Sequence, residues 1–250
     1  MLIEPMTQKL YAMKLNGMAI ALEEQRKDST IAELVFEDRL ALLVERQYVH
    51  TEQRAFKSRL HYSGLKENGP CLEAIDYRAK RNLSRNLLEP LITTQWIDHG
   101  QNALITGPTG VGKTYIAKAL ARHACKNAFR TIVVYSPKLF RALKAAELDG
   151  SLPKLLNKFA KASLLVIDDF GLETATASDY RLFLEILQER IGETSTLVTS
   201  QYAIGVWHDL IKDPTIADAI LDRLVHSAYR IDLQGDSMRK TENQNTNRNS

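Results

Sequence analysis

The segment from Gly107 to Thr114 reads GPTGVGKT and matches the phosphate-loop pattern G-x-x-x-x-G-K-[ST] at every fixed position. Glycines let the backbone curl until successive amide N–H groups face the phosphates, and the following helix adds its positive dipole end. Lys113 is expected to bridge the β- and γ-phosphates, and the Thr114 hydroxyl to bind Mg²⁺. The pattern therefore predicts a nucleoside triphosphate site formed by Gly107, Pro108, Thr109, Gly110, Val111, Gly112, Lys113 and Thr114.

Two adjacent carboxylates, Asp168 and Asp169, end a second apolar run in the segment SLLVIDDFG. Charged groups avoid the end of a buried strand unless they are paired or bound to a metal. Asp168 is expected to hold Mg²⁺, mostly through water, and Asp169 to polarise an attacking water molecule. Together with the phosphate loop, this pair predicts binding of ATP or GTP with Mg²⁺.

Short apolar runs alternate with helical patterns in the part of the chain that carries these residues. The runs predict strands at Ala103–Thr106, Thr131–Tyr135, Leu164–Ile167, Thr196–Thr199 and Tyr229–Leu233. Helical spacing predicts helices at Lys113–Lys126, Leu139–Glu147, Leu152–Lys161 and Asp179–Ile191. Continuous apolar strands separated by helices favour an α/β fold, with a parallel sheet covered by helices on both faces.

Residues 6–60 contain almost no strand pattern and predict a small all-helical N-terminal domain of two or more helices. Thr30 and Glu33 have the spacing of a capping box that starts a helix. A stripe at helical spacing is interpreted as a packing face, and it comprises Met6, Leu10, Met13, Gly17 and Ile20.

The segment SGLKENGP, residues 63–70, is the best candidate for a linker, because it holds two glycines and a proline. We therefore predict a helical N-terminal domain over residues 1–66, for DNA or partner binding and assembly, and an ATPase domain over residues 67–240. Residues 241–250 are polar and without an apolar pattern, and they are expected to be disordered.

Composition sets broad limits on the class of protein. The net charge of +3 and the pI near 8.7 are too mildly basic to indicate nucleic-acid binding by themselves. The two cysteines, Cys71 and Cys125, are far apart, as in a reduced cytoplasmic protein. We see neither a secretory signal nor an apolar run long enough to span a membrane, and we expect a cytoplasmic protein without a membrane partner.

Two later segments narrow the family. TSTLVTSQY is an apolar strand that ends in polar residues, and ADAILDRLVHSAYRIDL is a helix with an arginine followed by a last strand. This order resembles the AAA+ superfamily. The resemblance implies that Gln201 is the polar sensor, with Ser200 and Thr199 as alternatives. It also implies that Arg223 is an arginine finger that completes the site of a neighbouring subunit.

Within that superfamily, the sequence from Cys71 to Lys240 most resembles the IstB-like helper ATPases of insertion sequences, and next the DnaC-type helicase loaders. The segments that carry the resemblance are CLEAIDYRAKRNLSR, QNALITGPTGVGKTYIAKAL, LLVIDDFG and DRLVHSAYRIDLQGDSMRK. The resemblance implies an ATPase that oligomerises on target DNA and recruits or stimulates a partner transposase. A DnaC-like loader, which would dock on a replicative helicase, is the alternative.

The chain departs from the superfamily pattern at several positions. Asp169 stands where most members have Glu, and Gln201 where Asn is common. Too few residues follow the last strand for the separate helical lid of many AAA+ proteins, and Arg239 is a candidate to replace the arginine of that lid in part.

A basic segment between Arg54 and Arg85 is the candidate contact for double-stranded DNA that the resemblance implies. Eight basic residues face three acidic ones there, so the local excess of +5 is larger than the net charge of the whole chain. If the end of this segment is helical, Arg78, Arg81 and Arg85 share one face. Such a face binds phosphates independently of sequence, although a solvated surface is the alternative. The candidate DNA contacts are Arg54, Lys57, Arg59, Arg78, Lys80, Arg81 and Arg85.

Two functions of other classes stay open on the sequence alone. A P-loop kinase would transfer the γ-phosphate to a small molecule, but it would need an acceptor pocket and a lid. A nucleotide-gated DNA-binding scaffold would hardly hydrolyse ATP, and the aspartate at position 169 keeps that possibility open.

Overall fold

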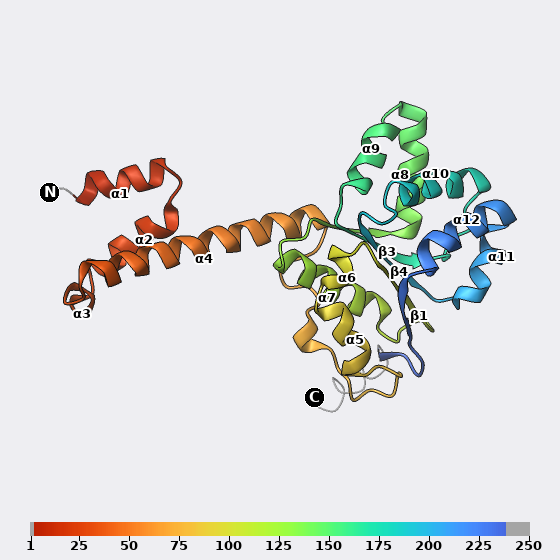
Figure 1. Ribbon diagram of the computed structural model, residues 1–250, viewed down its shortest axis with the longest axis horizontal. Helices are drawn as coiled ribbons and strands as arrows, with labels where there is room; N and C mark the ends of the chain where they lie inside the picture. The colour runs from red at the N-terminus through yellow and green to blue at the C-terminus, as the bar shows by residue number, and fades with distance from the viewer. Residues whose placement is uncertain (1–2, 239–250) are drawn as a thin grey trace, which may run out of the picture. The chain divides into compact units, whose positions relative to one another are not determined.

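The computed structural model describes residues 3–238, which form two compact units divided between Ser58 and Arg59. The larger unit contains a five-stranded sheet in the order β2-β3-β4-β1-β5, and all of its neighbouring strands pair in parallel (Figure 1). The strands are β1 (Asn102–Thr106), β2 (Thr131–Tyr135), β3 (Leu164–Phe170), β4 (Ser195–Ser200) and β5 (Ala228–Asp232). The predicted parallel sheet is confirmed, and only β2 agrees with its predicted bounds at both ends.

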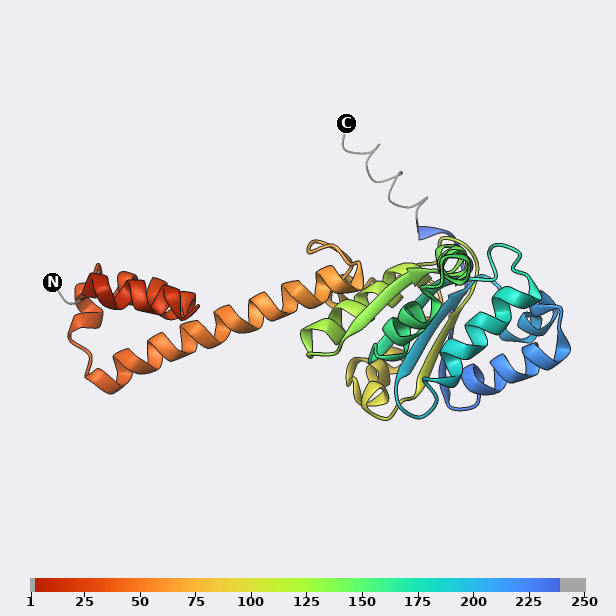
Figure 2. The same ribbon diagram turned by 90° about the horizontal axis from the view of Figure 1, so that it is seen from above.

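Helices cover both faces of the sheet, as the apolar runs predicted (Figure 2). In β3, Leu165 and Ile167 belong to one core, whereas Leu164 and Val166 belong to the other, because successive side chains of a strand point to opposite faces. One face is covered by α5 (Arg85–Ile92), α6 (Gln95–Asp98) and α7 (Lys113–Lys126). The other is covered by α8 (Ser136–Asp149), α9 (Leu152–Ala160), α10 (Ala177–Gln188), α11 (Trp207–Ile211) and α12 (Pro214–Val225).

Two short 3-10 helices, η1 (Leu72–Ala74) and η2 (Ile204–Val206), complete the larger unit. Met238, the last residue that the structure describes, lies six residues after the end of β5, and the described residues include no helical lid beyond this strand. Arg239 and the tail over residues 241–250 lie outside the described residues.

A buried arginine ties α9 and α10 to the start of β4. Arg190 is only 2% exposed, and its guanidinium donates to the carbonyls of Phe159 (2.5 Å), Ala162 (2.8 Å) and Ser195 and to the Thr196 hydroxyl (3.1 Å). Burial lowers the pKa of Arg190 to about 9, so the side chain is still charged at neutral pH. These hydrogen bonds compensate the guanidinium and three carbonyls for the loss of water.

Replacing Arg190 with leucine is therefore expected to lower the free energy of unfolding by about 3 kcal/mol or more. The substitution removes the guanidinium from three buried carbonyls, of which that of Phe159 keeps the Ala162 amide as a donor (3.3 Å). Each buried carbonyl left without a donor costs about 1–3 kcal/mol. Urea unfolding followed by circular dichroism measures the change. Arg181→Leu is the matched control, because Arg181 is exposed on α10; equal midpoints for the two variants would contradict the assignment.

The smaller unit is helical, with α1 (Ile3–Ala12), α2 (Asn16–Gln25), α3 (Ser29–Ala32) and the first part of α4 (Phe36–Ser63). The interpretation of the stripe at helical spacing as one packing face is wrong, because Met6, Met13 and Ile20 are 46%, 60% and 38% exposed. The chain leaves helical geometry between α1 and α2, so the stripe does not share one face. Gly17 is the member of the stripe that is buried: a Cβ there would lie 2.7 Å from the Arg46 carbonyl oxygen, because α2 approaches α4 closely.

The predicted capping box is also wrong. Asp28 caps α3, because its carboxylate accepts hydrogen bonds from the Thr30 amide (2.9 Å) and hydroxyl (2.6 Å). Thr30 lies inside this short helix, and Glu33 follows its end. The aspartate two residues before Thr30 offers a better acceptor at the N-terminus.

Within residues 3–238, no helix combines the length and the apolar character needed to cross a membrane.

Candidate functional site

The phosphate loop connects the end of β1 to the start of α7, as its sequence predicted. Lys113 is 5% exposed, and its Nζ donates to the carbonyls of Gly107 (2.7 Å) and Pro108 (2.8 Å). Val111 is fully buried and anchors the middle of the loop to the core. The ammonium group is thus held inside the curve of the loop, where it would meet phosphate oxygens.

All three glycines of the loop adopt backbone conformations that other residues rarely reach. The φ angle is 136° at Gly107, 91° at Gly110 and 100° at Gly112. A Cβ at Gly107 would meet the Leu233 carbonyl, and one at Gly112 would meet the Arg81 guanidinium. Both the curvature of the loop and its close neighbours therefore require glycine at these positions.

Thr114, Asp168 and Thr199 form one polar cluster next to the loop. The Oδ1 atom of Asp168 accepts hydrogen bonds from the hydroxyls of Thr114 (3.0 Å) and Thr199 (2.7 Å), and the aspartate is only 6% exposed. The ends of parallel strands meet at one edge of a sheet, and this brings β3 and β4 to the start of α7.

A hydroxyl and a carboxylate are ligands that Mg²⁺ prefers, so Thr114 and Asp168 fit the ion that the loop implies. The part of the chain that the structure describes has no group of three or more His, Cys, Asp or Glu side chains that could hold a metal by itself. Phosphate oxygens and water would therefore complete the coordination shell.

Asp169 lies in a local irregularity of β3. The pairing of β3 with β4 shifts between Ile167 and Phe170, and Asp169 has φ 59°, which aspartate tolerates better than most residues. Its amide donates to the Thr199 hydroxyl (2.9 Å). Tyr135, at the end of β2, pairs with the neighbouring Asp168. Partial burial, and then the Asp169 carboxylate, raise the pKa of Tyr135.

The sensor candidates at the end of β4 have different environments. The Oε1 atom of Gln201 accepts a hydrogen bond from the Thr109 hydroxyl of the phosphate loop (3.2 Å). Thr199 contacts Asp168, whereas the Ser200 hydroxyl donates to the Phe170 carbonyl (2.8 Å). Gln201 and Thr199 therefore lie at the site, and Ser200 joins two strands.

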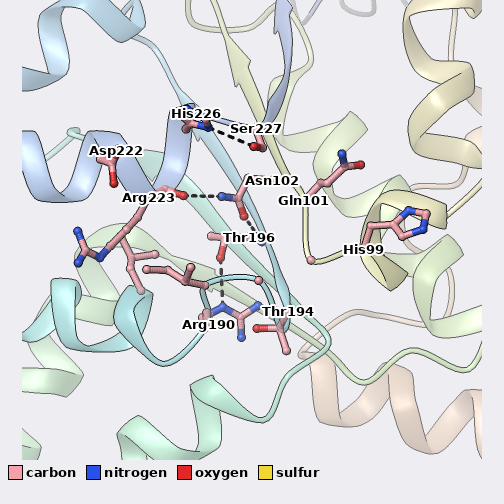
Figure 3. A pocket seen from close by; sticks show the side chains of 14 residues that line it. His99, Gln101, Asn102, Arg190, Thr194, Thr196, Asp222, Arg223, His226 and Ser227 are labelled. Carbon is pink, nitrogen blue, oxygen red and sulfur yellow. Dashed lines mark hydrogen bonds between the residues drawn. The ribbon is translucent and has the colours of Figure 1, made fainter.

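Arg223 lies where the strands begin, and the phosphate loop lies where they end, on the opposite side of the sheet. The Asn102 side chain, at the start of β1, donates to the Arg223 carbonyl (2.7 Å), and the guanidinium donates to Gln188 (3.1 and 2.5 Å) and to the Ala219 carbonyl (2.7 Å). Arg223 lines a pocket of about 560 Å³ (Figure 3). The length of β1, about 13 Å at ~3.3 Å per residue, separates this edge from the loop of the same chain.

The structure contradicts the predicted basic face. Residues 78–84 are not helical, since α5 begins at Arg85. Arg81 is only 4% exposed and donates to the carbonyls of Val111 (3.0 Å) and Asp76 (2.6 Å). Its predicted role as a DNA contact is therefore wrong, because the guanidinium is buried against the phosphate loop.

The other basic candidates are at least partly accessible. Arg59 is half-buried, and its Nε donates to the Cys125 carbonyl (2.7 Å). Arg85 lies over the ring of Tyr77 at 5.4 Å from its centre. The exposed candidates are Arg54, Lys57, Arg78, Lys80 and Arg85.

The segment after β5 also packs on the phosphate loop, which the sequence did not predict. The Leu233 amide donates to the Thr106 carbonyl (2.8 Å), and the Met238 amide donates to the Gly110 carbonyl (3.0 Å). Both contacts join backbone atoms of segments far apart in the chain, so no pattern of residue types predicts them.

Comparison with known proteins identifies the family. The family of IstB-like ATP binding proteins matches residues 8–246. The chain belongs to this family. A putative insertion sequence ATP-binding protein of Sinorhizobium fredii is 40% identical over 97% of the chain and 98% of its own length. The putative ATP-binding protein of insertion sequence IS21 from Pseudomonas aeruginosa is 26% identical over 93% of the chain and 88% of its own length. The predicted family is thus confirmed.

Solved structures show the same fold. DnaI aligns with 66% of this IstB-like chain and 90% of its own chain, at 25% identity and a TM-score of 0.54. The replication initiator DnaA, bound to AMPPCP and single-stranded DNA, aligns with 66% of the chain and 53% of its own, at 17% identity and a TM-score of 0.52. The second likeness supports the AAA+ fold alone.

Proposed function

We propose that this insertion-sequence ATP-binding protein is an ATP-driven helper of transposition. It binds ATP with Mg²⁺, oligomerises on double-stranded DNA and recruits or stimulates a partner transposase. The observation that carries the proposal is the cluster of Thr114, Asp168 and Thr199 beside a complete phosphate loop, in a chain of the IstB-like family.

The residues of the site support ATP hydrolysis to ADP and phosphate. Lys113 would neutralise the β- and γ-phosphates, while Thr114 and Asp168 would hold a Mg²⁺ ion that stabilises charge on them. Asp169 would orient the attacking water, and Gln201 would report the state of the γ-phosphate through its bond to Thr109. Aspartate is shorter than the usual glutamate, so we expect slow hydrolysis that depends on assembly.

The position of Arg223 supports completion of the site by a neighbouring copy. The guanidinium cannot reach the phosphate loop of its own chain, because the length of the sheet separates them. In a head-to-tail contact, the side of the sheet where the strands begin would face the side where the strands end in the next copy. This contact would bring Arg223 to the neighbour's γ-phosphate. Assembly and hydrolysis would then be coupled.

Sizing the protein by light scattering tests this proposal, with ATP, with ADP, and with ATP plus duplex DNA. The largest species is expected with ATP and DNA together. A monomer under all three conditions contradicts the assembly that the proposal requires.

Exposed basic side chains near the start of the ATPase domain support DNA binding. Replacing both Arg78 and Lys80 with glutamate is expected to weaken binding of duplexes of any sequence, because these side chains would neutralise phosphates. The slope of log affinity against log salt should fall by about 2, at roughly 0.9 for each lost phosphate contact. Fluorescence anisotropy at several salt concentrations measures this slope.

Lys158 and Lys161, which are exposed at the end of α9, provide the matched control. The double glutamate variant at these positions changes the net charge by the same amount. An equal loss of affinity in both double variants would contradict the assignment of the contact to Arg78 and Lys80.

A helicase loader is the second candidate, favoured by the alignment with nearly the whole DnaI chain. Its N-terminal unit would dock on a replicative helicase instead of DNA. A pull-down against both partners separates the candidates, since a loader captures the helicase and leaves the transposase unbound.

A nucleotide-gated scaffold would share the phosphate loop but would release little phosphate. Steady-state phosphate release, measured with and without DNA, separates such a scaffold from an ATPase that DNA assembly stimulates.

A further inference from the structure

Arg81 lies against the outer side of the phosphate loop. Its Nη1 donates to the Val111 carbonyl (3.0 Å) and its Nη2 to the Asp76 carbonyl (2.6 Å), so one guanidinium joins the loop to the segment before α5. Burial lowers the pKa of Arg81, and the nearby Asp76 carboxylate offsets part of this shift. The Nε atom is buried, and none of the residues 3–238 provides it with a hydrogen-bond partner. Burying a guanidinium in this way is costly, so its place beside the loop needs an explanation.

The planarity of the peptide bond links this contact to the nucleotide. In a trans peptide, the carbonyl of one residue and the amide N–H of the next point in opposite directions. When Arg81 holds the Val111 carbonyl on the outer side of the loop, the Gly112 N–H points towards the inner side. Amide hydrogens on the inner side are what a phosphate loop offers to its ligand.

The segment after β5 orients the peptide bond between Gly110 and Val111 in the same way. The Met238 amide holds the Gly110 carbonyl outward (3.0 Å), so the Val111 N–H points inward. The Arg81 carbonyl in turn accepts a hydrogen bond from the Gln234 amide (3.1 Å). Arg81 therefore joins the loop, the segment before α5 and the segment after β5.

Gly112 shows how close this approach is. The Arg81 guanidinium occupies the space that a Cβ at position 112 would need. Absence of a side chain there lets the guanidinium reach the Val111 carbonyl directly.

We infer that Arg81 is a positioning residue for ATP binding, which holds the Val111 carbonyl outward and so keeps the Gly112 amide in the orientation that the phosphates require. It acts through the loop backbone and from outside the loop. The inference rests on the ATP binding that the family implies, and it does not depend on DNA binding, assembly or a transposase.

Binding assays with two probes test this role. A fluorescent ATP analogue with Mg²⁺ reports binding of the whole nucleotide, and inorganic triphosphate, used as a competitor, reports the phosphate contacts alone. Arg81→Met removes both hydrogen bonds, whereas Arg81→Lys keeps the charge but cannot reproduce the planar fork. Arg181→Met is the matched control, because it removes an exposed arginine on α10 to which neither ATP nor DNA binding is assigned.

Arg81→Met is expected to raise the dissociation constant ~10–100-fold for both probes, and Arg81→Lys at least about 10-fold, while Arg181→Met changes neither. Thermal unfolding without nucleotide checks that the variants are folded; if Arg81→Met is not, Arg81→Lys decides. Unchanged affinity in a folded variant overturns the inference. A loss for the ATP analogue but not for triphosphate also overturns it, because Arg81 would then act on the base. Absence of binding in the wild-type protein contradicts the proposed function instead.

Discussion

Replacement of Lys113 with alanine is expected to abolish saturable binding of a fluorescent ATP analogue with Mg²⁺. The Lys113 ammonium lies inside the loop, bonded to the carbonyls of Gly107 and Pro108, and it is the group placed to meet two phosphates. A hydrogen bond to a charged group contributes about 1.5–3 kcal/mol. Loss of the two hydrogen bonds expected between Lys113 and the β- and γ-phosphates corresponds to a rise in the dissociation constant of ~10²-fold or more.

Lys126→Ala is the matched control for this variant. Lys126 lies at the exposed end of the same helix, α7, far along the chain from the loop. Its replacement is expected to leave the dissociation constant unchanged. Undiminished binding by Lys113→Ala would contradict the assignment of the loop as the ATP site.

Replacement of Arg223 with alanine is expected to reduce ATP hydrolysis by the assembled protein ~10³-fold, as for other arginine fingers supplied by a neighbouring chain. The dissociation constant of the ATP analogue for a dilute subunit should not change, because Arg223 lies at the far edge of the sheet from its own loop. Steady-state phosphate release and analogue binding measure the two effects separately.

Arg181→Ala, at an exposed arginine of α10, controls for the loss of a positive charge in this region. It should leave phosphate release unchanged. Full activity of a dilute Arg223→Ala monomer would instead favour a self-contained enzyme, such as a kinase for a small molecule.

The residues that could be predicted from the sequence are those whose neighbours along the chain define them. The phosphate loop carries its own pattern, and Asp168 follows a run of four apolar residues that are all fully buried in β3. The strand order was not predicted; the structure places β4 between β3 and β1, and this brings Thr114, Asp168 and Thr199 together at the carboxyl ends of the strands.

The contacts that could not be predicted join segments that are distant in the chain. Arg81 looks like one more member of a basic segment, and only the fold shows that its guanidinium reaches Val111. The contact of Met238 with Gly110 involves backbone atoms alone, so residue types give no signal for it. The predicted packing face of the smaller unit, from Met6 to Ile20, was wrong for a related reason. The chain leaves helical geometry between α1 and α2, and this ends the periodicity that the prediction assumed.

Mixing two inactive variants tests the central claim, that neighbouring copies share each ATPase site, most directly. Arg223→Ala keeps an intact phosphate loop and Asp169, whereas Asp169→Asn keeps Arg223. If Arg223 acts in the neighbour's site, a mixture contains interfaces with both groups intact, and we predict phosphate release well above the sum of the two variants alone. A mixture no more active than that sum, from variants that still assemble together with ATP, would contradict the account.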